Sequence, residues 1–174
     1  LGSGNGRDAM FLAKCFEHVL AVDGSEIAIE ECIAKSEKES LNNIDFIHSL
    51  INDNNLVNAI QNILLTAKTE VPIYIYSRFF LHSINDEDED SMVFLISQLL
   101  ENNEGSIYLE FRTKKDEHLS KYTGSHYRRY VDPQVLVKKF SKHGFSLDYS
   151  VQGVGFAKFN VDDAHVARLV LSKA

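Results

Sequence analysis

Three glycines alternate with other residues at the start of the chain, in the segment Leu1-Gly2-Ser3-Gly4-Asn5-Gly6-Arg7. Glycines at this spacing let a backbone turn tightly and approach a ligand without interference from a Cβ atom. The residues after Gly6 favour a helix, whose first N–H groups and positive dipole end attract anions. The segment is therefore predicted to hold the carboxylate end of an amino acid, or a phosphate.

An acidic residue, Asp23, lies seventeen positions after Gly6 and directly follows the short apolar strand expected at 18–22. A carboxylate at the end of a strand can accept hydrogen bonds from both hydroxyls of a ribose, and its charge disfavours a 2′-phosphate. The glycine spacing is G-x-G-x-G, whereas a dinucleotide-binding fingerprint is G-x-G-x-x-G. The alternative is a chance association of a glycine-rich loop with an aspartate in a turn.

Residues 1–23 resemble the first two motifs of the class I S-adenosylmethionine-dependent methyltransferases, and the strand–helix alternation of the remaining chain agrees with that fold. The resemblance implies a Rossmann-like three-layer α/β sandwich. Its sheet would be mostly parallel, with strand order 3-2-1-4-5-7-6 and an antiparallel last strand. It also implies that S-adenosyl-L-methionine is the cofactor, that the glycines wrap its methionine part and that Asp23 holds its ribose. The predicted cofactor-binding residues are Gly2, Ser3, Gly4, Gly6, Arg7, Asp23, Gly24 and Asn52.

Two features depart from the family pattern. The first strand of the family, with the acidic residue that precedes its glycine loop, would lie before Leu1, so the first strand is expected to be absent from this chain. The third strand of the family often ends in an aspartate that contacts adenine. Here the corresponding run is Ser49-Leu50-Ile51-Asn52-Asp53, so Asn52, Asp53 or the backbone could make that contact.

The acceptor side is predicted from segments that follow the expected fourth and fifth strands, because ligands of open α/β sheets bind beyond the carboxyl ends of the strands. Residues 76–82, 110–113 and 126–130 should converge there, bringing together Arg78, His82, Arg112, His126, Arg128 and Arg129. Several arginines in one cleft suit a phosphate or a carboxylate. A neutral histidine can take the proton of a hydroxyl acceptor. His126, His82 and Arg78 are the predicted catalytic residues.

Structural roles are the alternative for each of these side chains. Any one arginine could be part of an ion pair, and Glu110 and Arg112 share a face of one strand, where each could pair with the other or with neighbours. His82 could face the core. The acceptor segments also resemble those of bacterial methyltransferases that act on surface glycans and related small molecules. That resemblance implies a small-molecule or glycan acceptor, anionic and phosphorylated ones included.

Two other functions remain open at this stage. A non-catalytic binding or scaffold domain could retain the methyltransferase fold. A nicotinamide-dependent oxidoreductase would share the alternation of strands and helices, although the glycine spacing argues against it.

Composition limits the partners. The 174 residues suit one compact domain, predicted to cover 1–174, and the formal net charge of −7 argues against broad nucleic-acid binding. No apolar run approaches the roughly 18 residues that cross a bilayer, so no membrane span is predicted. Cys15 and Cys32 are expected to be reduced core thiols in predicted helices, which suits a cytoplasmic protein. No Cys/His spacing suggests a metal site.

The expected elements alternate along the chain. Ser25 and Asp132 are predicted N-caps, Gly144 closes the last helix, and Gly153 or Gly155 marks a bulge or a turn. In the second helix, Ile27, Ala28, Cys32 and Ile33 are expected to face inward. The acidic run 85–90 is expected to be solvated, and 113–131 to be a long polar loop. Helices are predicted at 7–16, 25–39, 54–67, 91–101 and from 133, and strands at 18–22, 44–50, 71–76, 106–112, 145–159 and 166–172.

Overall fold

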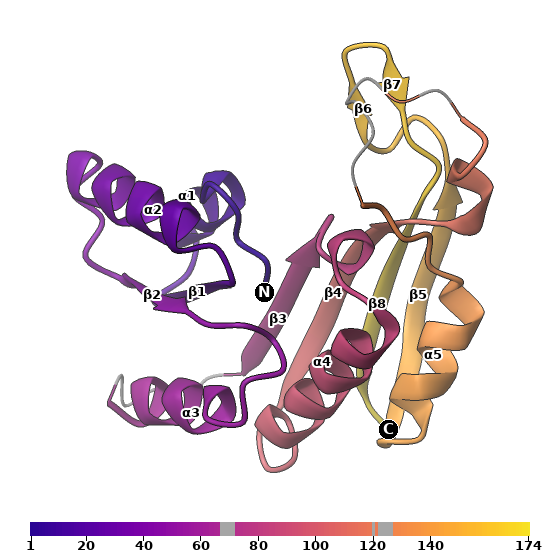
Figure 1. Ribbon diagram of the computed structural model, residues 1–174. Coiled ribbons are helices and arrows are strands. Elements are labelled where there is room, and N and C mark those ends of the chain that lie inside the picture. Colours follow the sequence, from indigo (N-terminus) through magenta and orange to yellow (C-terminus); the bar gives the residue numbers. More distant parts are fainter. Residues whose placement is uncertain (67–71, 120, 122–126) are drawn as a thin grey trace. The chain divides into compact units, whose positions relative to one another are not determined.

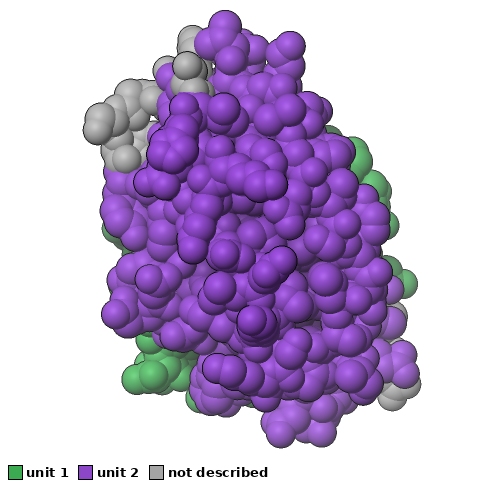
Figure 2. Space-filling view, turned by 90° about the vertical axis from the view of Figure 1, so that its right-hand side faces the viewer, with its two compact units in different colours: residues 1–70 green, residues 71–174 purple. Residues whose placement is uncertain are grey.

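The computed structural model (Figure 1) describes residues 1–66, 72–119, 121 and 127–174. The chain divides into two compact units, residues 1–70 and residues 71–174, which Figure 2 colours separately. Each unit has its own sheet and its own buried residues. The expectation of one domain over 1–174 stays a prediction.

The first unit alternates helices and strands, and its two strands pair in parallel. In register, Val19 lies opposite Ile44 and Asp23 lies opposite His48, so both strands end at the same edge. The elements are α1 (Arg7–Ala13), β1 (Val19–Asp23), α2 (Glu26–Lys38), β2 (Ile44–His48) and α3 (Leu56–Thr66). Ser25 caps α2 as predicted, because its Oγ accepts a hydrogen bond from the Ala28 N–H at 3.3 Å.

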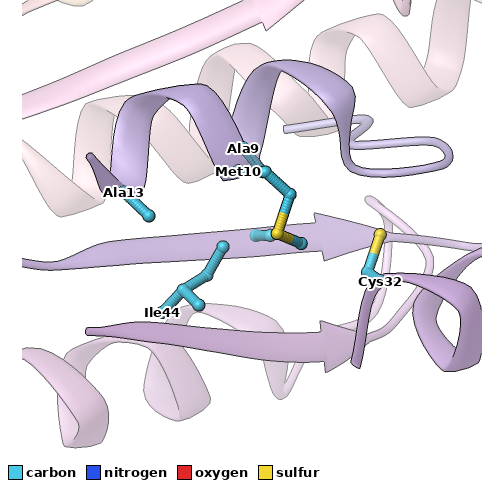
Figure 3. Packing of buried hydrophobic residues seen from close by; sticks show 6 residues of the cluster. Ala9, Met10, Ala13, Cys32 and Ile44 are labelled. Carbon is cyan, nitrogen blue, oxygen red and sulfur yellow. The ribbon is translucent and has the colours of Figure 1, made fainter. Parts of the chain in front are cut away.

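Small and apolar side chains fill the core of this unit. Figure 3 shows Met10 and Ala13 pointing from α1 toward β1, with Cys32 of α2 and Ile44 of β2 in the same cluster. The predicted inner face of α2 is partly wrong. Cys32 is buried as predicted, but Ile27 and Ile33 are exposed and Ile29 and Ser36 are buried instead, so the buried stripe lies to one side of the expected one.

The second unit is built on a four-stranded sheet in the order β3-β4-β8-β5. β3 and β4 are parallel, and β8 runs antiparallel to both β4 and β5. In Figure 1, α4 and α5 lie on one face of this sheet. The elements are β3 (Ile73–Arg78), η1 (Leu81–Ser83), α4 (Asp86–Leu99), β4 (Gly105–Arg112), η2 (Lys114–Asp116), α5 (Pro133–Ser141), β5 (Phe145–Gly153), β6 (Lys158–Phe159), β7 (Asp162–Asp163) and β8 (Val166–Lys173).

The strand connections confirm the predicted fold class. In the order 3-2-1-4-5-7-6, the neighbours 3-2 correspond to β2-β1, and 4-5-7-6 correspond to β3-β4-β8-β5, with the last strand antiparallel.

Three local predictions are wrong. The helix expected at 91–101 begins at Asp86, so the acidic run forms its first turns; most of the run is exposed as expected, but Glu89 is buried. Asn85 caps α4 by accepting a hydrogen bond from the Asp88 N–H at 2.7 Å, and acidic side chains in the first turn favour the helix dipole. The strand expected at 145–159 ends at Gly153 and is followed by the β6–β7 hairpin, and its bulge lies between Leu147 and Tyr149. Cys15 lies in the turn after α1 and is exposed.

Candidate functional site

The glycine segment forms a tight loop that needs glycine at three positions. Gly2, Gly4 and Gly6 have φ angles of +68°, +50° and +79°, a region that other residues rarely adopt. The Gly6 N–H donates to the Ser3 carbonyl at 3.0 Å and closes the loop. The N–H groups of Gly2 and Ser3 both donate to the Val22 carbonyl, at 2.9 and 3.1 Å, and fasten the loop to the end of β1.

Asp23 lies directly beside this loop, as the sequence predicted. Its Oδ2 accepts a hydrogen bond from the Gly4 N–H at 2.7 Å, and its Oδ1 accepts one from the Ser25 N–H at 2.9 Å. A carboxylate offers about four lone-pair positions. Two backbone donors therefore leave this carboxylate able to accept further hydrogen bonds, such as those of a diol.

The loop also has room and an unsatisfied polar atom. A Cβ atom added to Gly4 would meet nothing within 4 Å, whereas one added to Gly6 would lie 2.6 Å from the Sγ of Cys32. The Oγ of Ser3 is buried and has no hydrogen-bond partner among the described residues. A buried hydroxyl without a partner is costly, so these two features fit a loop built to receive a polar ligand.

The other predicted cofactor residues lie around the same strand ends. Arg7 is exposed and pairs with Asp8, with 3.0 Å between Nε and Oδ1. The Gly24 carbonyl oxygen lies 3.2 Å from His48 Nε2. Asn52 is exposed in the turn after β2, whereas Asp53 uses its Oδ1 to accept the Asn55 N–H at 2.8 Å near the start of α3. A ligand-binding role for Arg7, Gly24 and Asn52 stays a prediction.

Two residues of α2 that the sequence did not single out for this site also contact the loop. The Cys32 thiol donates to the Gly4 carbonyl at 3.2 Å, and the Lys35 ammonium donates to the Asn5 carbonyl at 2.7 Å. Burial raises the pKa of the Cys32 thiol, although the nearby charge of Lys35 opposes this. Cys32 and Lys35 are three positions apart on the helix that follows Asp23, so they share one helix face. That spacing is the sequence feature from which their common contact with the loop could have been predicted.

In the second unit, Arg78 and Arg112 belong to two separate ion-pair clusters. Glu110 holds Arg78 and Arg168, each with a 2.6 Å contact from Nε. Arg112 pairs instead with Asp116 at 2.6 Å and with Asp162 at 2.8 Å. Burial opposes the charge of Arg112, but its hydrogen bonds to these two carboxylates outweigh that effect and raise its pKa above the ordinary value.

Arg129 also has a structural role. Its guanidinium contacts Asp86 and Glu89, each at 2.5 Å, and its Nε donates to the Ile84 carbonyl at 2.9 Å. Its backbone N–H donates to the His82 carbonyl at 2.9 Å, so this residue fastens η1 and the start of α4. For Arg112 and Arg129 the geometry favours the ion-pair interpretation that the sequence left open.

The predicted catalytic residues are not all described. His82 is partly buried in η1, and its ring packs edge-on against Phe79 with 5.8 Å between centroids. Phe79 has a φ angle of +55°, unusual for a bulky residue, and the Arg78 guanidinium lies 5.3 Å from its ring centroid. His126 lies outside the described residues. Catalytic roles for His82, His126 and Arg78, and any ligand role for Arg128, stay predictions.

Within the described ranges, no group of three or more His, Cys, Asp or Glu side chains is arranged to hold a metal ion. No described helix combines the length and the apolar character needed to cross a membrane.

Comparison with known proteins gives structural relatives only. No protein-family model matches the chain, and no curated protein matches its sequence. The magnesium protoporphyrin IX methyltransferase of Synechocystis PCC 6803, with bound S-adenosylhomocysteine, aligns with a TM-score of 0.69 and 15% identity over 99% of this chain and 71% of that enzyme. A methyltransferase from Methanosarcina mazei aligns with a TM-score of 0.72 and 13% identity over 99% of this chain and 89% of that protein. One from Clostridium acetobutylicum gives a TM-score of 0.70 and 11% identity, with coverage of 99% and 82%.

At these identities the likeness establishes the fold. The chain has the fold of the class I S-adenosylmethionine-dependent methyltransferases, as residues 1–23 predicted. The Synechocystis enzyme has S-adenosylhomocysteine bound in one structure and S-adenosylmethionine in another.

Proposed function

We propose that this chain binds S-adenosyl-L-methionine at the glycine loop and transfers its methyl group to a small-molecule acceptor. The hydrogen bond from the Gly4 N–H to Asp23 Oδ2, 2.7 Å long, is the observation that carries this proposal. It joins the two sequence features that the resemblance assigns to one cofactor. The fold shared with methyltransferases supports the same function.

The loop residues suit the two ends of this cofactor. The backbone of Gly2, Gly4 and Gly6, with the buried Ser3 hydroxyl, would hold the methionine part, and the Asp23 carboxylate has acceptor positions left for the ribose hydroxyls. When bound, the cofactor supplies a methyl group on a sulfonium that a nucleophile can attack directly. The chain's own contribution is then chiefly to hold the reactants in line and exclude water.

We further propose that the acceptor is a small molecule or a glycan, anionic or phosphorylated ones included, and that His126 or His82 takes the proton of its attacking hydroxyl. An imidazole is suited to that step because it titrates near neutral pH. The partly buried guanidinium of Arg78, beside the ring of Phe79, is the proposed contact for an anionic group.

Calorimetric titration with S-adenosylhomocysteine tests the cofactor proposal. The wild-type chain should bind, and Asp23→Ala should bind about tenfold to a hundredfold more weakly, since hydrogen bonds to a charged group contribute about 1.5–3 kcal/mol. Asp23→Asn, which keeps one acceptor oxygen, should lie between the two. Unchanged affinity in Asp23→Ala would remove the ribose assignment.

Two controls separate the competing functions. A nicotinamide oxidoreductase would bind NADH, so a fluorescence titration with NADH should show no binding. A scaffold domain would bind the cofactor without turnover. Against a panel of sugar phosphates and other small hydroxylated acceptors, a methyltransferase releases S-adenosylhomocysteine. Replacing His126 or His82 should then lower turnover while leaving cofactor affinity unchanged.

A further inference from the structure

We propose that Cys32 and Lys35 of α2 are positioning residues for the cofactor, because they fix the orientation of two consecutive peptide groups in the glycine loop. This inference rests on the proposed function of that loop. Neither residue belongs to the predicted cofactor set, and neither is assigned a direct contact with the ligand.

The first peptide group joins Gly4 and Asn5. Its carbonyl accepts the Cys32 thiol hydrogen at 3.2 Å. A trans peptide is planar, and its N–H points opposite to its carbonyl. The Asn5 N–H therefore points away from the Cys32 thiol.

The second peptide group joins Asn5 and Gly6. Its carbonyl accepts a hydrogen bond from the Lys35 ammonium at 2.7 Å, and its N–H, on the opposite side, donates to the Ser3 carbonyl at 3.0 Å. One side of this peptide is thus held by α2 and the other by the loop itself. Rotation of either peptide plane would break a contact with α2.

The remaining donors of the loop show why this orientation matters. The N–H groups of Gly2 and Ser3 are bound to Val22, and that of Gly4 is bound to Asp23. Among the described residues, the Asn5 N–H has no such partner. We therefore assign it as the loop donor that meets the carboxylate of the cofactor, in the orientation that Cys32 imposes.

Packing supports the same role. Cys32 is fully buried, and its Sγ lies so close to Gly6 that an added Cβ would be 2.6 Å away. The thiol therefore fills the space beneath the loop as well as binding its carbonyl.

Calorimetric titration with S-adenosylhomocysteine, on the full chain, tests the proposal with matched controls. Cys32→Ala should weaken binding about twofold to tenfold, the range for loss of one ordinary hydrogen bond, and Cys32→Ser should restore most of it. Lys35→Met keeps the side-chain stem and should weaken binding about twofold to threefold, since its contact is exposed. Ser36→Ala and Lys38→Met are the controls. Ser36 is buried on the same helix but bonds to the Ile33 carbonyl, and Lys38 is exposed one turn further on.

Thiol labelling gives a second readout that does not depend on turnover. Iodoacetamide labelling followed by mass spectrometry should show that S-adenosylhomocysteine slows modification of the buried Cys32 and leaves the exposed Cys15 unaffected. The ligand should steady the loop that covers the thiol.

The outcomes separate this inference from the proposed function. Wild-type affinity in Cys32→Ala and Lys35→Met, with only the melting temperature lowered, would overturn the positioning role and leave cofactor binding intact. Absence of binding to the wild type would instead overturn the proposed function. If Cys32→Ala does not fold, the decision rests on Cys32→Ser and on Lys35→Met, whose site is only partly buried. A lysine variant that binds like wild type refutes the proposal.

Discussion

Replacing Gly6 by alanine should destabilise the chain much more than the same replacement at Gly4, although the two glycines are two residues apart in one loop. Both have positive φ angles, of +79° and +50°. They differ in what a new methyl group would meet. At Gly6 the methyl would lie 2.6 Å from Cys32 Sγ and 3.2 Å from Met10 Cε, whereas at Gly4 it would meet nothing within 4 Å.

The magnitudes follow from these two effects. A left-handed backbone costs a residue with a Cβ about 1–2 kcal/mol, and this applies at both positions. Overpacking a filled core adds about 1–3 kcal/mol, and this applies only at Gly6, because the new methyl would meet the fully buried Cys32. Gly6→Ala should therefore lower the free energy of unfolding by about 2–5 kcal/mol, and Gly4→Ala by about 1–2 kcal/mol.

Urea denaturation followed by far-UV circular dichroism measures both variants. The double variant Gly6→Ala/Cys32→Ala supplies the internal check, since removing the sulfur should recover most of the crowding cost and give a coupling of about 1–3 kcal/mol in a double-mutant cycle. Binding of S-adenosylhomocysteine should show the opposite pattern, because Gly4→Ala places its methyl in the open space of the loop. Relative to the stability that each variant loses, Gly4→Ala should lose more affinity than Gly6→Ala. Equal destabilisation by the two substitutions, or no coupling with Cys32, would refute the packing described for α2 under the loop.

Three further predictions concern ionisable groups. Glu89→Ala should lower the free energy of unfolding by about 1–3 kcal/mol, because Arg129 and Lys139 lose a buried carboxylate but keep Asp86 and Asp90, and urea denaturation measures the loss. Burial raises the pKa of the Cys32 thiol above its ordinary value of 9.0, so the stability it contributes is present below pH 9.0 and is lost as pH rises toward the folded pKa. Unfolding measured between about pH 8 and pH 10.5 should therefore show a flatter profile for Cys32→Ala than for wild type. Arg78→Met should cost about 1–3 kcal/mol on thermal or urea unfolding, because the buried Glu110 loses one of its two arginine partners.

The glycine loop and its contact with Asp23 could be predicted from the sequence because their determinants are local. Gly2, Gly4 and Gly6 each require a backbone region that only glycine enters easily, and the requirement is visible in the residue type itself. Asp23 is the last residue of a short strand, and the glycine loop is bonded to the end of that strand. The Asp23 carboxylate therefore lies beside the loop. What the sequence pattern missed was the α2 face. Cys32 was expected to face inward and does, but Ile29 and Ser36 are buried in place of Ile27 and Ile33. The contacts of Cys32 and Lys35 with the loop were not foreseen.

Most strands of the second unit could be predicted, but its ion pairs could not, for a different physical reason that also limits how its arginines can be interpreted. The residue type of an arginine does not indicate which distant carboxylate will be its partner. Arg112 meets Asp116, four residues on, but also Asp162, fifty residues on, and Arg129 meets Glu89 across forty residues. The acidic run 85–90 was expected to be solvated because charges avoid burial unless they are paired. Glu89 is buried because two cations from later in the chain, Arg129 and Lys139, neutralise it. Arginines near strand ends are therefore weak indicators of an anionic acceptor until their carboxylate partners are known. Closely spaced glycines are a stronger indicator, because the tight turn that they allow depends on no distant residue.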